Sequence, residues 1–346
     1  MFSPFGRLGR RLGDRVAQTL GRGVPPTRKA ETDPLAASCL EKVNRFAGSP
    51  PPGWIVDRLG IRTQWKFVDG HWPHTAEQVS QMWQQVPAPE VNGLEYYEWV
   101  DLVHAVMAAQ ERFVMVELGA GYGRWAVRAA RLVEALNPMP CTLVAVEAEP
   151  THFQWLLEHF RDNDLDPDRH HLVCAPVARS RDAVNFLVGQ AATCYGQAIV
   201  AAPVPREDGL VPQSMPAVTL ADILDPHERV DLIDLDIQGA ELDVLGAAID
   251  LLDERVKRLQ IGTHGLEIEA GLRRLFQDHG WGIEQDFACG SKVYVPKLGR
   301  DLDVGDGVQT WVNPRLRAKA SDEGRADSDR RSWQARPAPP PKRTNA

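Results

Sequence analysis

The feature that most limits the fold of this chain is an alternation, beginning at residue 113, between short apolar segments and amphipathic segments. Short apolar runs predict strands, and apolar residues three or four positions apart predict helices with one buried face. Strands that alternate with helices are typical of crossover units in a parallel sheet. We therefore expect a doubly wound α/β fold with a mostly parallel, seven-stranded sheet. The predicted strands are Phe113–Leu118, 142–147, 171–175, 230–236, Arg258–Thr263 and, as a closing antiparallel edge, 282–288 and Gly307–Val312.

The connections between these strands are predicted to be helices. The spacing of apolar residues predicts helices over 123–136, 153–160 and 268–276, and one continuous helix over 242–252. The segment 178–229, between the third and fourth strands, has no regular pattern and is expected to be irregular.

The first predicted strand runs into a glycine-rich turn with the sequence Gly119-Ala120-Gly121-Tyr122-Gly123. Glycines between a strand and a helix let the backbone turn sharply and approach a ligand closely. The second strand ends in Glu147, where a carboxylate is placed to accept hydrogen bonds from ribose hydroxyls. Such a turn alone is weak evidence, because residues 121–126 also fit a dinucleotide-binding pattern that ends in alanine.

One carboxylate favours a different ligand. Glu117 precedes the first glycine of the turn, where its charge would face a pyrophosphate unfavourably. The same carboxylate suits a ligand with an ammonium group, such as the methionine end of S-adenosylmethionine. We therefore favour that cofactor, and an NAD-dependent oxidoreductase remains a less favoured alternative.

A later motif supports the same choice. The segment 230–245, VDLIDLDIQGAELDVL, resembles the FkbM-type methyltransferases, as do LVAVEAEP at 143–150 and VTLADIL at 218–224. The resemblance covers about residues 113–282. It implies a Rossmann-like class I methyltransferase fold, S-adenosylmethionine as the methyl donor, and a hydroxyl of a sugar, glycan or secondary metabolite as the acceptor.

The resemblance also assigns residues by position. It implies that Glu117 and Gly119–Gly123 bind the methionine end, that Glu147 with Ala148 binds the ribose, and that Ala175 to Val177 lie near the adenine. Asp236, at the end of the fourth strand, completes the cofactor set. No acidic residue follows the third strand, so adenine recognition there would depend on backbone groups and apolar contacts.

Three residues are candidates for catalysis, because they follow strands four and five. Asp236 is the first candidate for the base that removes the proton of an acceptor hydroxyl. Glu241 is a candidate for orienting the acceptor, and His264, between two glycines, for a general base near neutral pH. Each also has a structural alternative: Asp236 facing the sulfonium, Glu241 stabilised by a helix dipole, and His264 as an ordinary loop residue.

A metal is the less favoured interpretation of the acidic residues. Asp234 and Asp236 lie on one face of the predicted strand, because side chains alternate along a strand. They could hold Mg²⁺ with waters, or one could contact the cofactor while the other supports it. We expect no metal.

The sequence divides into four regions. Residues 34–110 are expected to be a mainly helical accessory region, whose first helix spans 35–46. Residues 111–314 are expected to be the catalytic domain, and 315–346 a disordered tail. Within residues 1–33, seven basic residues precede position 30 against the single acidic Asp14, with apolar residues at helical spacing. This pattern favours either a helix on an anionic membrane surface or an unstructured basic tail.

Composition limits the partners and the compartment. The net charge is −8, which disfavours nucleic acid as a partner. The five cysteines show no metal-ligand spacing, and no export signal or apolar span is evident, so we expect a cytoplasmic protein with free thiols. The predicted function is O-methylation of a small-molecule or glycan hydroxyl. A non-catalytic methyltransferase-like binding module is the alternative from another class, and the oligomeric state is not predicted.

Overall fold

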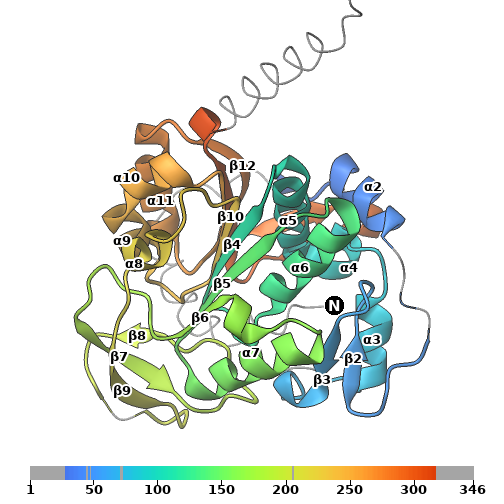
Figure 1. Ribbon diagram of the computed structural model, residues 1–346, viewed down its shortest axis with the longest axis horizontal. Coiled ribbons are helices and arrows are strands. Elements are labelled where there is room, and N and C mark those ends of the chain that lie inside the picture. Colours follow the sequence, from blue (N-terminus) through green and yellow to red (C-terminus); the bar gives the residue numbers. More distant parts are fainter. Residues whose placement is uncertain (1–27, 44–45, 47, 71–72, 205, 317–346) are drawn as a thin grey trace, which may run out of the picture.

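The computed structural model describes residues 28–43, 46, 48–70, 73–204 and 206–316. Its centre is a seven-stranded sheet in the order β12-β15-β11-β10-β4-β5-β6 (Figure 1). All neighbours pair in parallel except β15, which is antiparallel to both β11 and β12. The strands are β4 (Phe113–Leu118), β5 (Cys141–Glu147), β6 (His171–Cys174), β10 (Leu232–Leu235), β11 (Arg258–Thr263), β12 (Gly282–Phe287) and β15 (Gly307–Val312).

The strand order confirms the doubly wound fold and locates its switch point. The chain enters the sheet at β4, runs outward through β5 to β6, and returns to pair β10 with β4 on the other side. Ligands in such sheets bind beyond the carboxyl ends of the strands where the order reverses. The switch point therefore lies between β4 and β10.

Alternate residues of the central strands face two different helical layers. Phe113 and Met115 pack in a core with α5 (Tyr96–Ala108), α6 (Arg124–Leu136) and α7 (Pro150–Asp162). Val114 and Val116 pack on the opposite side, against α8 (Leu220–Leu224), α9 (Glu241–Ala247), α10 (Ile249–Arg255) and α11 (Leu266–Asp278). This alternation fixes which polar side chains of β4 and β10 share a face.

Two predicted helices differ from the structure. The segment 242–252 is not one helix but the pair α9 and α10, because Ala248 leaves helical geometry with φ −122° and ψ 15°. The first predicted helix stops at Lys42, as α2 (Pro34–Lys42), because Val43 is extended. The two predicted closing strands are confirmed as the antiparallel end of the sheet: β15 pairs with β11, and β12 is the edge strand.

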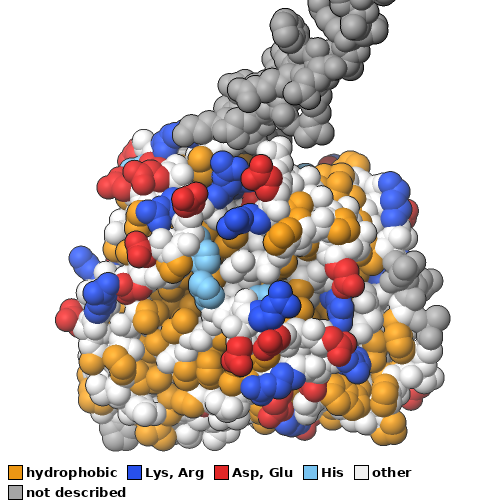
Figure 2. Space-filling model, viewed as in Figure 1, with side chains coloured by type: hydrophobic (Ala, Val, Ile, Leu, Met, Phe, Trp, Pro, Cys, Tyr) orange, Lys and Arg blue, Asp and Glu red, His pale blue; other side chains and the backbone are white. Residues whose placement is uncertain are grey.

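The segment 178–229 is also more regular than expected. It forms a small antiparallel sheet, β8-β7-β9, beyond the β6 edge of the main sheet (Figure 1). The strands are β7 (Ala183–Val188), β8 (Ile199–Val200) and β9 (Val211–Pro216). Prolines at both ends of β9 argue against a strand in the sequence, but an edge position accommodates them. Figure 2 shows hydrophobic side chains gathered over this part of the surface, where Val211 is 60% exposed.

The N-terminal region combines helices with a hairpin. Its elements are α2, β2 (Trp54–Val56), β3 (Arg62–Gln64), α3 (Ala76–Trp83) and α4 (Pro89–Asn92), with 3-10 turns at Trp65–Phe67 and Gly93–Glu95. Its last helix, α5, packs on α6 and covers β10 and β11. Trp99 of α5 meets Trp125 of α6 with ring centroids 5.4 Å apart, and Asp101 pairs with Arg258 of β11 at 2.6 Å. The region 34–110 therefore contributes one helix to the layer over the central sheet.

The first described residues join the C-terminal part of the chain. Strand β1 (Arg28–Lys29) pairs in parallel with β13 (Lys292–Val295), which pairs with β14 (Arg300–Asp303). Most of the predicted membrane-contact segment, residues 1–30, and of the predicted disordered tail, residues 315–346, lies in 1–27 and 317–346, outside the described residues. Within the described ranges, no helix combines the length and apolar character needed to cross a membrane.

Candidate functional site

The glycine-rich turn after β4 lies against the end of β10. Gly119, Gly121 and Gly123 have φ values of +77°, +56° and +74°, which side-chain-bearing residues rarely adopt. An added Cβ on Gly119 would overlap the backbone oxygen of Asp236. The Asp236 amide also donates to the Leu118 carbonyl at 2.9 Å. The turn and Asp236 therefore meet at the switch point of the sheet.

The middle glycine is covered by an aromatic ring that the sequence analysis did not single out. A Cβ on Gly121 would lie 2.9 Å from the ring of Tyr195. This ring stacks on His152, with centroids 4.1 Å apart and planes 4° from parallel. The Tyr195 hydroxyl donates to the Phe67 carbonyl at 2.7 Å. Tyr195 therefore ties the 178–229 segment to the N-terminal region directly above the turn.

Glu147, at the end of β5, connects the glycine turn to the start of α7. Its Oε2 accepts a 2.7 Å hydrogen bond from the Gly121 amide, and its Oε1 accepts one of 2.7 Å from the Glu149 amide. Burial raises the pKa of the Glu147 carboxyl to about 8, although both hydrogen bonds act to lower it. The following Ala148 is buried beside it. Glu147, the residue predicted to bind the ribose, is thus hydrogen-bonded to the glycine-rich turn.

The predicted adenine neighbours form an apolar border. Ala175 and Val177 are 8% and 4% exposed. Val177 forms an isolated parallel bridge with Val218, and the Ala178 amide donates to the Val218 carbonyl at 2.9 Å. This border supplies backbone and apolar groups but no carboxylate.

Glu117 is held beneath the first turn of α6. Its two carboxylate oxygens accept hydrogen bonds from the amides of Trp125, at 3.1 Å, and Ala126, at 2.8 Å. Burial raises its pKa to about 7, against the effect of these two hydrogen bonds. Its two oxygens are thus already engaged by the helix terminus, and its contact with an ammonium group stays a prediction.

The three predicted catalytic residues lie together beyond β10 and β11. His264 Nδ1 is 2.7 Å from Glu241 Oε1, and His264 Nε2 is 3.3 Å from Asp236 Oδ1. The side chain of Asp236 is 58% exposed, whereas those of His264 and Glu241 are 11% and 0% exposed. Asp236 therefore presents its carboxylate at the surface of the site, with His264 and Glu241 behind it.

The electrostatics of this cluster favour a charged histidine. Burial acts to lower the pKa of His264, but the charges of Asp236 and Glu241 and their hydrogen bonds raise it well above its usual value. Burial acts to raise the pKa of Asp236, but His264 and a 2.8 Å hydrogen bond from Gln238 lower it overall. An imidazolium has no free lone pair, so His264 in this arrangement supports an ionised Asp236 and does not itself accept a proton.

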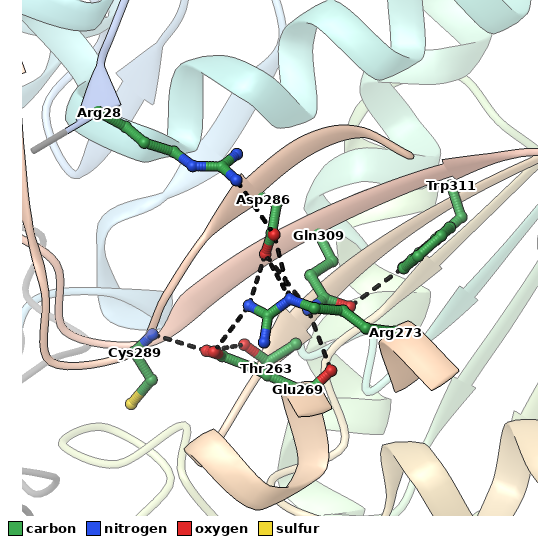
Figure 3. A network of polar contacts seen from close by, with 8 residues as sticks. All are labelled: Arg28, Thr263, Glu269, Arg273, Asp286, Cys289, Gln309 and Trp311. Carbon is green, nitrogen blue, oxygen red and sulfur yellow. Dashed lines mark hydrogen bonds and ion pairs between the residues drawn. The ribbon is translucent and has the colours of Figure 1, made fainter. Parts of the chain in front are cut away.

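A polar network anchors the strand that carries His264 (Figure 3). Glu269 of α11 is fully buried and accepts hydrogen bonds from Thr263 Oγ1, at 2.9 Å, and from the Cys289 amide, at 2.6 Å. Arg273 joins Glu269 to Asp286 of β12, at 3.2 Å and 2.6 Å. Because Thr263 immediately precedes His264, this network holds the end of β11 in place.

The acidic residues of β10 do not form a metal-binding group. Asp234 faces the layer of α5, and Asp236 lies beyond the strand beside His264. Among the described residues, no group of three or more His, Cys, Asp or Glu side chains is arranged to hold a metal ion. The alternative of a Mg²⁺ site therefore gains no support from their geometry.

Residues 117–280 match the family model described as the methyltransferase FkbM domain. The chain contains an FkbM methyltransferase domain. The matched segment extends from Glu117 to Gly280 and includes the glycine turn, Glu147 and the Asp236–Glu241–His264 cluster. Members of methyltransferase families of this class use S-adenosylmethionine as the donor.

Sequence similarity to a known protein extends beyond the FkbM domain. A protein of Jannaschia sp. (strain CCS1), described as "Putative methyltransferase", is 25% identical over 289 residues, which cover 80% of this chain and 98% of that protein. The structure of methyltransferase FkbM from Methylobacillus flagellatus KT is 15% identical, covers 58% of this chain and 44% of that one, and has a TM-score of 0.36. The precorrin-6y C5,15-methyltransferase of Geobacter metallireducens GS-15 is 13% identical over 62% of this chain and 86% of that one, with a TM-score of 0.34.

Proposed function

We propose that this chain is an S-adenosylmethionine-dependent O-methyltransferase that acts on a hydroxyl of a sugar, glycan or secondary metabolite. The observation that supports it most is the meeting of the glycine turn and Asp236 at the switch point of the sheet, within the FkbM domain. A donor site and an ionised carboxylate then adjoin at one edge. Nucleic acid is not proposed as the acceptor, because the chain carries a net charge of −8.

The residues present fit the donor. Gly119 to Gly123 allow close backbone approach, and we assign Glu147, at the end of β5, to the ribose hydroxyls. The apolar border of Ala175 and Val177 suits the adenine. When bound, S-adenosylmethionine would supply an electrophilic methyl group to the acceptor oxygen, and its sulfur would keep the electron pair of the broken carbon–sulfur bond.

The chain's own groups position the acceptor and take its proton. Asp236 accepts the hydrogen bond of the acceptor hydroxyl and then its proton, because it is ionised and exposed at the strand end. His264 holds Asp236 in place from behind, and Glu241 fixes the His264 ring through Nδ1. In this proposal Asp236 is the catalytic residue, and His264 and Glu241 are positioning residues.

A second candidate function is a binding module without methyl transfer. It is favoured by one observation, the ring of Tyr195 lying against Gly121 where a donor would approach the turn. An NAD-dependent oxidoreductase is a weaker alternative, because the carboxylates at the switch point would disfavour a pyrophosphate.

Calorimetric titration with S-adenosylhomocysteine, with NAD as the comparison ligand, tests the donor site. Gly121→Arg should abolish binding, whereas Gly290→Arg, which has a similar positive φ of +69° but open space around it, should not. Release of S-adenosylhomocysteine in a screen of sugar and polyol acceptors then separates enzyme from binding module. Preferential binding of NAD, or no binding of either ligand, would contradict the proposed function.

We also propose that residues 1–30 make peripheral membrane contact, on the basis of their charge and apolar spacing. Deleting residues 1–27 leaves strand β1 in place. The full chain should sediment with anionic liposomes, whereas the truncated protein should stay in the supernatant. Equal sedimentation of both proteins would exclude this role.

A further inference from the structure

We propose that Asp306, in the turn before β15, binds a second hydroxyl of the acceptor and so limits the acceptor to a polyol such as a sugar. The inference rests on the proposed function and refines its acceptor. Asp306 lies beyond the matched segment of residues 117–280, so this part of acceptor recognition would come from outside the FkbM domain.

Strand register places Asp306 beside His264. Strands β11 and β15 are antiparallel, and the last pair of their ladder is Thr263 with Gly307. His264 follows Thr263, and Asp306 precedes Gly307. The two residues therefore lie opposite each other where the ladder ends, at the carboxyl end of β11.

The direction of the two side chains follows from the pair before them. An added Cβ on Gly307 would overlap Thr263 Oγ1 and Glu269 Oε1, so the pair of Thr263 and Gly307 faces α11. Successive side chains along a strand point to opposite faces of the sheet. His264 and Asp306 therefore face the other side, away from α11.

Asp236 lies on that same side. An added Cβ on Gly262, two residues before His264, would be 3.4 Å from the carboxyl carbon of Asp236. Burial raises the pKa of Asp306, the charge of His264 acts to lower it, and the charges of Asp236 and Glu241 raise it further. All three groups are thus close enough for their charges to act on Asp306, in agreement with the register.

The turn that carries Asp306 is fixed to its surroundings. The Gly290 amide donates to the carbonyls of Val304 and Gly305, both at 3.1 Å. The preceding Cys289 amide donates to Glu269 in the network of Figure 3. The network that anchors the end of β11 therefore also holds the turn before β15.

The carboxylate of Asp306 is available to a ligand. Its side chain is half-buried, and it has no hydrogen-bond or ion-pair partner among the described residues. Asp236 uses Oδ1 for its contacts with Gln238 and His264, and its Oδ2 accepts no hydrogen bond within the described ranges. Two carboxylates with unused oxygens thus lie around the His264 ring.

Unsatisfied polar atoms indicate which kind of ligand group fits. Oε2 of Glu241, a fully buried residue, and Nε2 of His264 are buried without a hydrogen-bond partner in the part of the chain that the structure describes. Nε2 has only its ion-pair contact with Asp236. Carboxylate oxygens accept, and an imidazolium N–H donates. A hydroxyl can do both, whereas an ammonium group only donates, so a ligand with several hydroxyls matches this mixture.

Methyl-transfer kinetics with matched sugar probes test the proposal. The probes are the methyl glycosides of glucose, galactose and mannose, each with its monodeoxy analogues, and release of S-adenosylhomocysteine is measured. The variant is Asp306→Ala. Asp303→Ala is the matched control, because Asp303, at the end of β14, is an exposed carboxylate that pairs with Lys292 at 3.7 Å.

A hydrogen bond to a charged group is lost in the variant, so its kcat/KM for the preferred glycoside should fall at least 10-fold, mainly through KM. One deoxy analogue, lacking a hydroxyl other than the one methylated, should lose as much with wild type and less than twofold more with Asp306→Ala. Such non-additivity identifies a direct contact. The control should stay within twofold of wild type on every probe, and the Kd for S-adenosylhomocysteine should change less than twofold in both variants.

Additive losses at every hydroxyl, or an equal fall of kcat on all probes, would give Asp306 a structural role and overturn the assignment. A wild-type chain that binds S-adenosylhomocysteine but methylates none of the glycosides would overturn it too, while leaving the donor site in place. A wild-type chain that does not bind S-adenosylhomocysteine contradicts the proposed function itself and the assignment with it.

A second variant guards against a folding defect. Asp306→Asn keeps the size of the side chain and one oxygen that accepts hydrogen bonds, but it loses the charge. Its loss of kcat/KM should therefore be smaller than that of Asp306→Ala and should arise at the same hydroxyl. A loss that arises at a different hydroxyl, or at none, would contradict the assignment.

Discussion

His264 Nδ1 lies 2.7 Å from Glu241 Oε1, and this contact joins the end of β11 to the first turn of α9. Glu241 is fully buried, and its Oε1 also accepts a 2.9 Å hydrogen bond from the Gly239 amide. Its second oxygen is buried without a hydrogen-bond partner in the described part of the chain. The fixed ring of His264 then sets the position of Asp236 on the exposed side.

The first prediction concerns Asp236→Asn. If Asp236 takes the acceptor proton, the variant should lose about 100-fold or more in kcat, in the range typical of a general base. The amide side chain has the same size, so the Kd for S-adenosylhomocysteine should change by less than about fivefold. Single-turnover methyl transfer together with calorimetry measures both.

Asp243→Asn is the control for Asp236→Asn, because Asp243 is an exposed carboxylate in the first turn of α9. This control should retain wild-type kcat. A variant of Asp236 with unchanged kcat would remove Asp236 from the reaction.

The second prediction is a pH dependence of stability from His264. Its pKa in the folded state is raised well above the usual value by Asp236 and Glu241, so the folded state binds the proton more tightly than the unfolded state. The resulting stabilisation is fully present below the unfolded pKa of about 6.5 and is lost as the pH rises through the folded pKa.

Chemical unfolding of wild type and His264→Gln at several pH values between 6 and 10 tests this prediction. The difference in free energy of unfolding should be largest near pH 6 and shrink as the pH rises. A difference that is constant across the range would mean that His264 is not charged in the folded protein.

Local sequence patterns were sufficient to predict the position of the glycine turn and the strand ends that carry the candidate catalytic residues. The glycine turn follows an apolar run whose bounds coincide with β4, and the cluster of Asp236 and His264 follows from strands that end at the same edge of a parallel sheet. The break at Ala248 was missed because its flanking residues keep helical spacing across it. A periodic pattern reports which residues are buried, and it does not report the backbone angle of one alanine.

Long-range contacts explain the other omissions. Tyr195 lies in a segment without regular spacing, and its place above Gly121 depends on contacts with Phe67 and His152, which are distant in the sequence. The sequence analysis also did not anticipate that the amides of Trp125 and Ala126, at the start of α6, donate hydrogen bonds to the Glu117 carboxylate. Neither relationship has a signature within a few residues.

The third prediction concerns the network behind His264. Glu269→Gln removes the charge of a fully buried carboxylate that binds the Cys289 amide, Thr263 and Arg273. Loss of a buried charged partner of this kind costs about 3 kcal/mol of unfolding free energy. Chemical denaturation measures the loss, and the exposed neighbour Glu267→Gln should stay within about 0.5 kcal/mol of wild type.

Equal stabilities of the Glu269 and Glu267 variants would show that the network in Figure 3 contributes no net stability. A loss of methyl transfer greater than the loss of folded protein would show, in addition, that the network positions His264.

The last prediction concerns Tyr195, whose ring covers Gly121. A donor that approaches the glycine turn must displace this ring, and the hydrogen bond from its hydroxyl to the Phe67 carbonyl opposes that movement. One neutral hydrogen bond contributes about 1 kcal/mol, so Tyr195→Phe should speed association of S-adenosylhomocysteine about fivefold. Stopped-flow fluorescence measures the rate constant, and Tyr294→Phe in β13 is the control. An association rate that Tyr195→Phe leaves unchanged would mean that the ring does not have to move, and that Tyr195 forms a fixed wall of the donor site.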